Sequence, residues 1–175
     1  MAILVTMASL TFAETIPMTI PMTDPTLDEL AYEEARLQFD LFTLDDAWAL
    51  GGALREGAAA CSGKVAIEIA LRDRSLFYTA LPGADVANGF WVRRKRNTVL
   101  ALGTSTLAVG MKLAKAGQTL EERYGLAPAR YASDGGSFPL RLRSLGVIGA
   151  ITVSGMPSLD DHRLVTRTVS AFLGL

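Results

Sequence analysis

Cysteine and histidine are almost absent from this chain of 175 residues, which has one of each, Cys61 and His162. A single cysteine excludes a disulfide within the chain, and the pair excludes a zinc site built from histidine and cysteine alone. The sequence also lacks any apolar run approaching the roughly 20 residues that a membrane helix needs. We therefore expect no metal site, no membrane partner and a reducing, cytoplasmic compartment.

An excess of charge of one sign is lacking as well. The 17 lysines and arginines and the 18 aspartates and glutamates leave a formal net charge of −1. Nothing in this balance attracts nucleic acid, so we expect no nucleic-acid partner. Half of the residues are hydrophobic and a fifth are charged, which is typical of a globular domain with a core of its own.

The amino-terminal stretch is apolar but lacks the positive charges of a secretory signal, because the first basic residue is Arg36. Three prolines fall between residues 15 and 25, which favours a linker over a core element. We expect a flexible arm over residues 1–25 and a single domain over residues 26–175. A signal segment and a start codon placed too early stay open as alternatives for the arm.

A hydroxyl residue, a leucine and two acids recur in that order at four places, beginning at Thr26, Thr43, Thr119 and Ser158. The hydroxyl can accept an unpaired backbone N–H at a helix start, and acids in the first turn face the positive end of the helix dipole. Each copy therefore predicts the start of a helix. With glycines as helix ends, the expected helices are 27–37, 44–60, 85–102, 106–116, 120–124 and 159–172.

Alternation with period two predicts the strands. Residues 64–71 and 76–81 flank a polar turn and should form an antiparallel hairpin, as should residues 138–143 and 147–154. Residues 38–42 are a candidate for a fifth strand. Helices before, between and after two hairpins predict the α+β class, with an antiparallel sheet of four or five strands and helices packed on it.

His162 shares a helical face with Val165 and Val169, so we expect the imidazole to point inward, one turn from a helix start. Two interpretations stay open, a packed core histidine and a ligand or acid/base group in a pocket. The adjacent Asp161 could orient His162 or close the loop at Gly155.

The run Arg93-Arg94-Lys95-Arg96 is the densest cluster of charge. Four consecutive residues cannot share one face of a helix, so at least one of them must turn toward the core or a neighbouring subunit. The run is either a solvated helix face or a clamp for an anion or carboxylate, with Trp91 stacking nearby.

Five segments in this order resemble the uncharacterised protein family 0303, a heme-degrading-domain-containing family of the GlcG/HbpS-like group. They are DAWALG at 46–51, LPG at 81–83, NGFWVRRK at 88–95, GGSFP at 135–139, and VSGMP at 153–157 with Asp161 and His162 after it. The resemblance implies a profilin-like fold, assembly into oligomers, and binding of haem or another small ligand. Thr104 and Ser105 stand where the family tends to carry paired serines.

We therefore expect a small-ligand-binding domain with haem as the candidate cofactor. The alternatives are a homo-oligomeric scaffold without catalysis, and an enzyme that uses His162 as general acid/base with Asp161 beside it. The residues expected to line one shared cavity are Arg93, Arg94, Ser105, Gly135, Gly136, Ser137, Phe138, Ser154, Gly155 and His162.

Overall fold

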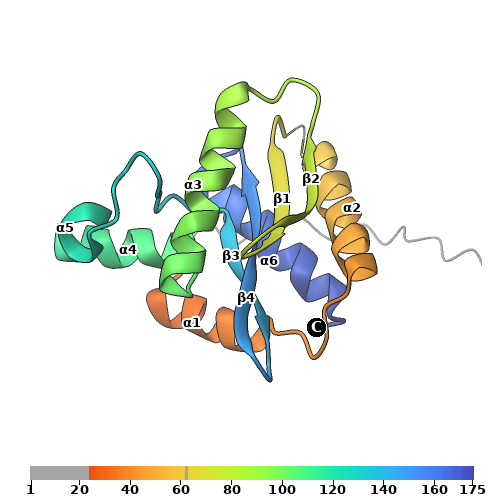
Figure 1. The fold of residues 1–175 in the computed structure, drawn as a ribbon, viewed down its shortest axis with the longest axis horizontal. Coiled ribbons are helices and arrows are strands. Elements are labelled where there is room, and N and C mark those ends of the chain that lie inside the picture. Colours follow the sequence, from red (N-terminus) through yellow and green to blue (C-terminus); the bar gives the residue numbers. More distant parts are fainter. Residues whose placement is uncertain (1–23, 62) are drawn as a thin grey trace, which may run out of the picture.

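A computed structural model of the chain describes residues 24–61 and 63–175, so that most of the predicted arm lies outside the described residues. Within them, helices alternate with two hairpins in the predicted order (Figure 1). The elements are α1 (Leu27–Arg36), α2 (Leu44–Ala60), β1 (Ala66–Leu71), β2 (Ser75–Ala80), α3 (Val86–Leu102), α4 (Thr106–Ala116), α5 (Leu120–Tyr124), β3 (Ser137–Leu142), β4 (Gly146–Ser154) and α6 (Ser158–Phe172).

The strands form one antiparallel sheet in the order β2-β1-β4-β3. Both predicted hairpins are present, and the long connection through α3, α4 and α5 returns the chain so that β4 pairs with β1. The candidate fifth strand is wrong. Only Phe39 of that segment forms a bridge, to Leu142, because the chain turns at once into the cap of α2 at Thr43.

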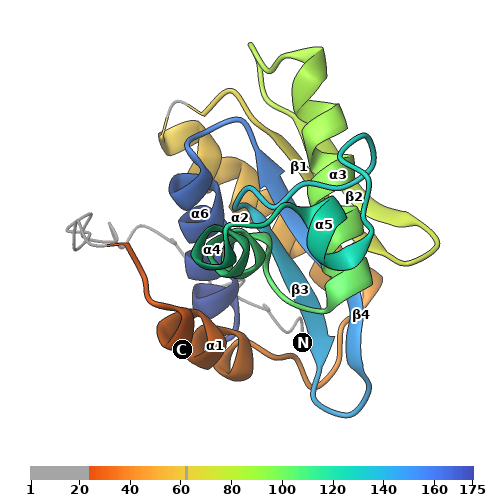
Figure 2. The same ribbon diagram turned by 90° about the vertical axis from the view of Figure 1, so that its left-hand side faces the viewer.

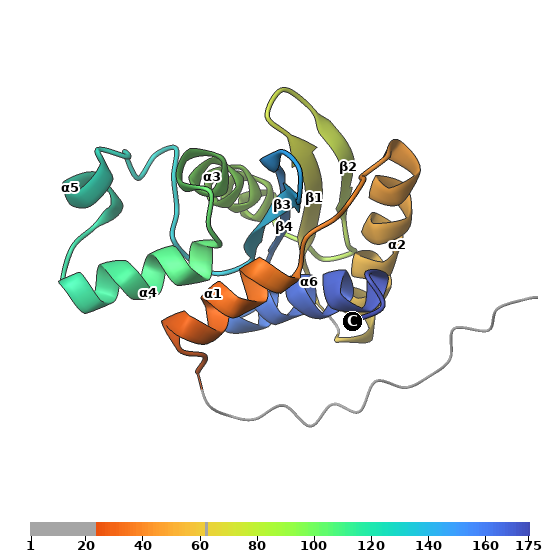
Figure 3. The same cartoon turned by 90° about the horizontal axis from the view of Figure 1, so that it is seen from below.

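Helices cover both faces of the sheet and so confirm the α+β class. Helices α2 and α6 pack on one face, while α3 crosses the other face over β4, β3 and β1 (Figure 2). Figure 3 shows the same arrangement from below, with α4 and α5 projecting away from the sheet beside α3. The sheet therefore lies between α3 and α6, which meet only near the end of β4, where Lys95 of α3 contacts Asp161 at the start of α6.

The side chains of β1 alternate between the two faces of the sheet, as predicted. Val65, Ile67 and Ile69 belong to the main core cluster, which α2 and α6 complete from their side. Glu68 points to the other face, where its carboxylate meets a guanidinium of α3. The register pairs Glu68 with Thr152, so that the hydroxyl-bearing positions of β4 also face α3. One face of the sheet is thus a dry core, and the other carries polar groups under α3.

Three of the four predicted helix caps have the expected geometry. Thr26, Thr43 and Thr119 each form a complete capping box with the residue three positions later. The fourth prediction is wrong, since α6 begins one residue earlier with Pro157 at the cap position and no side-chain cap bond. The hydroxyl of Ser158 instead accepts a hydrogen bond from the Gly135 amide, in the loop before β3.

Helices α4 and α5 enclose a second, small apolar cluster built on Val109, Leu113 and Leu120. Among the described residues no single helix is long and apolar enough to cross a membrane. The pair α3 and α4, which bends by 78° at its break, meets that criterion by length and composition alone.

Candidate functional site

The side chains of the arginine run point in different directions around α3, as the geometry of a helix requires. Lys95 turns inward and is only 3% exposed, while Arg93 is exposed and Arg94 and Arg96 are partly exposed. The sequence required one inward residue and could not say which. The three arginines, which we call the arginine ridge, belong to the helix that covers the face of the sheet opposite α2 and α6.

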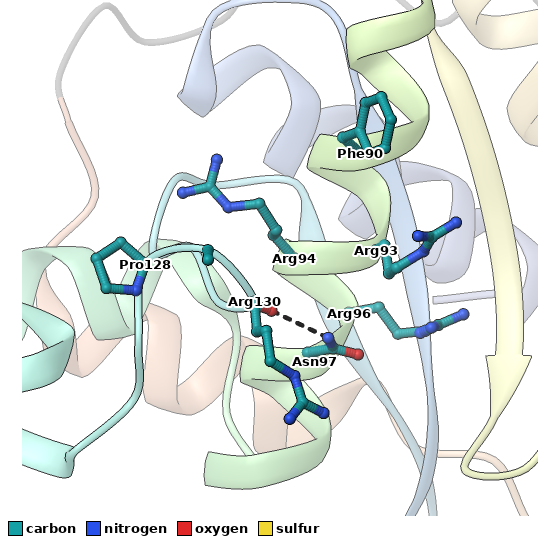
Figure 4. A pocket seen from close by; sticks show the side chains of 8 residues that line it. Phe90, Arg93, Arg94, Arg96, Asn97, Pro128 and Arg130 are labelled. Atoms are coloured by element: carbon teal, nitrogen blue, oxygen red, sulfur yellow. Dashed lines mark hydrogen bonds between the residues drawn. The ribbon is translucent and has the colours of Figure 1, made fainter.

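This ridge lines a groove with a volume of about 710 Å³. We call it the arginine groove; its lining residues are Phe90, Arg93, Arg94, Arg96, Asn97, Pro128, Ala129 and Arg130. Figure 4 shows Arg94 and Arg130 extending on the side of the 128–130 segment, and Arg93 and Arg96 on the opposite side of α3. The guanidinium groups thus spread over both sides of the helix and do not converge on one point.

Protein contacts hold two of these guanidinium groups in place. Arg94 lies over the Trp91 ring, 4.4 Å from its centroid, and donates to the carbonyl oxygen of Tyr131 at 3.3 Å. Arg96 donates to a Glu68 carboxylate oxygen at 2.8 Å. The predicted stacking of Trp91 on the run is therefore present, and it orients Arg94 along the wall of the groove.

Arg93 and Arg130 are exposed and have no carboxylate partner within the part of the chain that the structure describes. Arg93 lies beside Phe90, with 6.0 Å from its central carbon to the ring centroid. Arg130 is brought to α3 by its backbone, because the Asn97 amide donates to the Arg130 carbonyl oxygen at 2.9 Å. No sequence pattern marks Arg130, since only tertiary structure places its loop against α3.

Asp161 closes the turn between β4 and α6, as one of the two interpretations predicted. One carboxylate oxygen lies 2.9 Å from Lys95 Nζ and 3.2 Å from the Gly155 amide nitrogen, and the other accepts from the Met156 amide at 3.1 Å. Burial raises the pKa of Asp161 from its ordinary value of 3.8, and Lys95 and the hydrogen bonds partly oppose that rise. Asp161 therefore acts as a structural clamp for the turn.

His162 points inward as predicted and is 2% exposed. Its Nε2 lies 2.9 Å from a Glu33 carboxylate oxygen, and its ring lies beside Phe138 at 6.1 Å between centroids. The predicted cavity shared with Arg93 and Arg94 is wrong, because the imidazole is buried on the α2/α6 face and the arginines lie over the opposite face. The helical period gave the correct inward direction but could not say which face of the sheet α6 covers.

Three other predicted site residues serve the fold. Ser105 is buried, caps α4, and donates its backbone N–H to Glu34 at 2.8 Å. The Ser137 and Thr152 hydroxyls share a hydrogen bond of 2.7 Å beneath α3 and α4. Phe138 is part of the main core cluster. None of the three lines the arginine groove.

The predicted glycine loop is packed into the end of the sheet. The Gly135 amide donates to the Ser158 hydroxyl at 2.6 Å, and the Gly136 carbonyl accepts from the Val153 amide at 2.7 Å. Gly136 has a φ of +119°, and a side chain there would meet backbone as well as Asp161. These glycines are needed for close backbone approach.

Ser154 and Gly155, the last of the predicted site residues, form the turn that follows β4. The Ser154 carbonyl accepts from the Asn88 side chain at 3.1 Å, which ties the turn to the start of α3. Gly155 has a φ of +147°, and a Cβ there would lie against backbone. The motif VSGMP is thus explained by the geometry of the turn.

Residues 42–170 match the model of the family described as haem degrading protein HbpS-like. The chain belongs to this family. A UPF0303 protein of Edwardsiella ictaluri is 51% identical over 149 residues, which cover 85% of this chain and 95% of the relative. A UPF0303 protein of Streptomyces coelicolor is 45% identical, with 85% and 94% covered. The resemblance inferred from the five segments is confirmed.

Solved structures of similar proteins carry the same fold as this member of the HbpS-like family. The Ybr137w protein superimposes with a TM-score of 0.80 at 31% identity, covering 85% of this chain and 88% of that protein. HbpS itself gives a TM-score of 0.61 at 24% identity, covering 79% and 94%. The complex of PduOC with haem gives 0.65 at 19% identity, covering 74% and 94%. The last two similarities concern the fold alone.

The arginine groove fits one part of a haem and not the other. Its guanidinium groups can pair with carboxylates such as propionates. The usual protein ligands of haem iron are histidine, cysteine, methionine and tyrosine, and none of them lines this groove. No cluster of histidine, cysteine, aspartate and glutamate that could hold a metal ion occurs among residues 24–61 and 63–175. The residues present therefore fit the organic anion but not its iron.

Proposed function

We propose that this protein is a binding module for a small organic anion, held in the arginine groove of α3. The supporting observation is the composition of the groove, in which four arginines and one exposed aromatic ring surround about 710 Å³ without an acidic side chain among the lining residues. Such a volume is typical of sites for drug-sized ligands. Arg130 is exposed, and Arg94 donates to Tyr131 through one of its five N–H groups, so both side chains can also donate to a ligand carboxylate.

Haem is the ligand that the family suggests, and its two propionates supply anions of the kind that the groove fits. The proposal does not include degradation of haem, because no general acid or base lines the groove. The geometry does not favour a catalytic role for His162, since its ring is 2% exposed and its Nε2 lies 2.9 Å from a Glu33 carboxylate oxygen. We further propose that the protein works in the cytoplasm, on the strength of its single cysteine.

Calorimetric titration with haem tests the proposal. We expect saturable binding that weakens about tenfold in Arg94→Ala and in Arg130→Ala, because a charge-assisted hydrogen bond contributes roughly 1.5–3 kcal/mol. Arg55→Ala is the matched control, since Arg55 is an exposed arginine of α2 on the other side of the molecule. Affinity that stays unchanged in both groove variants would contradict the proposal.

We also propose that the chain forms a homo-oligomer, the second candidate function. Strand β2 is at the edge of the sheet, so its outer backbone groups have no strand partner within the described residues. Beside it the Trp48 side chain is 73% exposed and contacts Phe77 at 5.8 Å between ring centroids. An uncovered edge with an exposed aromatic favours pairing with a second copy.

Light scattering tests the proposed homo-oligomer. A mass of one chain at micromolar concentration would count against this proposal, and Trp48→Ser should lower the mass of any oligomer.

A further inference from the structure

The arginine groove suits the carboxylates of a haem but offers no ligand for its iron. The groove supplies positive charge at four positions and an exposed phenyl ring, with Phe90 58% exposed. Coordination of iron needs a nitrogen, sulfur or phenolate donor aimed at the site, and the lining residues have none. A ligand in this groove would therefore be held through its carboxylates and its apolar body.

We infer that the groove recognises the anionic macrocycle and not its metal, so that metal-free porphyrin dicarboxylates bind as well as haem. This inference rests on the proposed function and names the ligand class of the same site. The arrangement of the arginines supports a ligand with two anionic groups, because Arg94 and Arg130 both extend on the side of the 128–130 segment and the two carboxylates of such a porphyrin project from one edge of its ring.

Neither His162 nor Tyr78 supplies an iron ligand to the arginine groove. His162 is on the opposite face of the sheet, with its Nε2 engaged by Glu33 at 2.9 Å. Tyr78 lines a neighbouring groove of about 580 Å³, which shares Phe90, Arg93 and Arg96 with the arginine groove. Its ring is exposed, and it is absent from the lining of the arginine groove.

The test compares three ligands on the intact protein by fluorescence and absorption titration: haem, protoporphyrin IX and the dimethyl ester of protoporphyrin IX. We expect the dissociation constants of haem and protoporphyrin IX to agree within about threefold, which is less than 1 kcal/mol. The dimethyl ester, which keeps the ring but loses both charges, should bind at least about tenfold more weakly. The Soret band of bound haem should be the same in wild type, His162→Ala and Tyr78→Phe.

The possible failures are distinguishable. Haem that binds more than about tenfold tighter than protoporphyrin IX, with a Soret band that shifts in His162→Ala or Tyr78→Phe, would overturn the inference and leave anion binding intact. Equal binding of the dimethyl ester would overturn the proposed function, because the arginines would then contribute nothing. If His162→Ala fails to fold, Glu33→Gln provides the second test, since it perturbs the same imidazole while keeping the ring in place.

Discussion

Lys95 Nζ on α3 lies 2.9 Å from the Asp161 carboxylate at the start of α6, and both side chains are almost completely buried. The ammonium group also donates to the Val153 carbonyl oxygen at 3.3 Å. One ion pair thus joins the helix that carries the arginine ridge to the opposite layer, around the end of β4. The ridge is held in place from inside by the single member of the RRKR run that does not face solvent.

Replacing Lys95 by methionine should destabilise the protein strongly at neutral pH. The variant leaves the Asp161 carboxylate buried without its counter-charge, and breaking a buried pair on one side typically costs about 3–5 kcal/mol. Urea denaturation followed by circular dichroism measures the loss. Arg93→Met, two residues away on the exposed ridge, is the matched control and should change the free energy of unfolding by less than about 0.5 kcal/mol.

The cost of Lys95→Met should depend on pH in a definite direction. The pKa of Asp161 is raised by burial above its ordinary value of 3.8, and Lys95 opposes this rise. A carboxyl with a raised pKa stabilises the fold most below its unfolded value, and that contribution is lost as pH rises through the folded pKa. Without Lys95 the pKa rises further, so the gap between variant and wild type should shrink as pH falls from 7 toward 3.8. A gap that is constant over this range would contradict the burial of an unpaired carboxylate.

Replacing two adjacent glycines of α2 by alanine should change the free energy of unfolding in opposite directions. A Cβ at Gly51 would press on the Phe77 ring, whereas a Cβ at Gly52 meets no atom within 4 Å. Gly52→Ala should therefore raise the free energy of unfolding by up to about 1 kcal/mol through helix propensity. Gly51→Ala should lower it by about 1–3 kcal/mol through overpacking. Chemical denaturation of both variants measures these effects, and equal signs would show that α2 does not pack on β2 as described.

The capping box of α2 should contribute about 1 kcal/mol to the free energy of unfolding. Thr43 Oγ1 accepts from the Asp46 amide at 3.1 Å, and the Asp46 carboxylate accepts from the Thr43 amide at 2.7 Å. Thr43→Ala removes the first bond and should cost about 0.5–2 kcal/mol, while Thr43→Ser keeps the hydroxyl and should cost only a few tenths. Thermal unfolding would detect the difference, and an alanine variant as stable as the serine variant would show that the box contributes nothing.

Binding in the arginine groove should weaken with ionic strength. Because Arg93 and Arg130 are exposed, their attraction for a ligand carboxylate is screened as the Debye length falls from about 10 Å at 0.1 M salt to about 3 Å at 1 M. The dissociation constant of protoporphyrin IX should therefore rise with salt in wild type and in Arg55→Ala. In the double variant Arg93→Ala/Arg130→Ala the rise should be smaller, and an unchanged slope would argue that these charges do not face the ligand.

The sequence predicted the elements well because their signals are local. A threonine followed three positions later by an acid determines a helix start, and all three such copies form boxes. The predicted cap at Ser158 was wrong because the partner of its hydroxyl is distant in the sequence. The Gly135 loop comes from another part of the chain and uses the hydroxyl that would otherwise cap α6.

The site was harder to predict because it depends on which face of the sheet each helix covers. Helical spacing showed correctly that His162 points inward and that one residue of the arginine run does too. It could not show that α3 and α6 lie on opposite faces, which separates Arg93 from His162. Arg130 carried no pattern at all, and only the folded loop brings it to α3.

A crystal structure of the complex with protoporphyrin IX tests the central claim most directly. We expect the porphyrin on the outer surface of α3, with its carboxylates within hydrogen-bonding distance of Arg94 and Arg130 and its ring beside Phe90. Porphyrin density beside His162 on the α2/α6 face, with the arginine groove filled by solvent, would contradict the account.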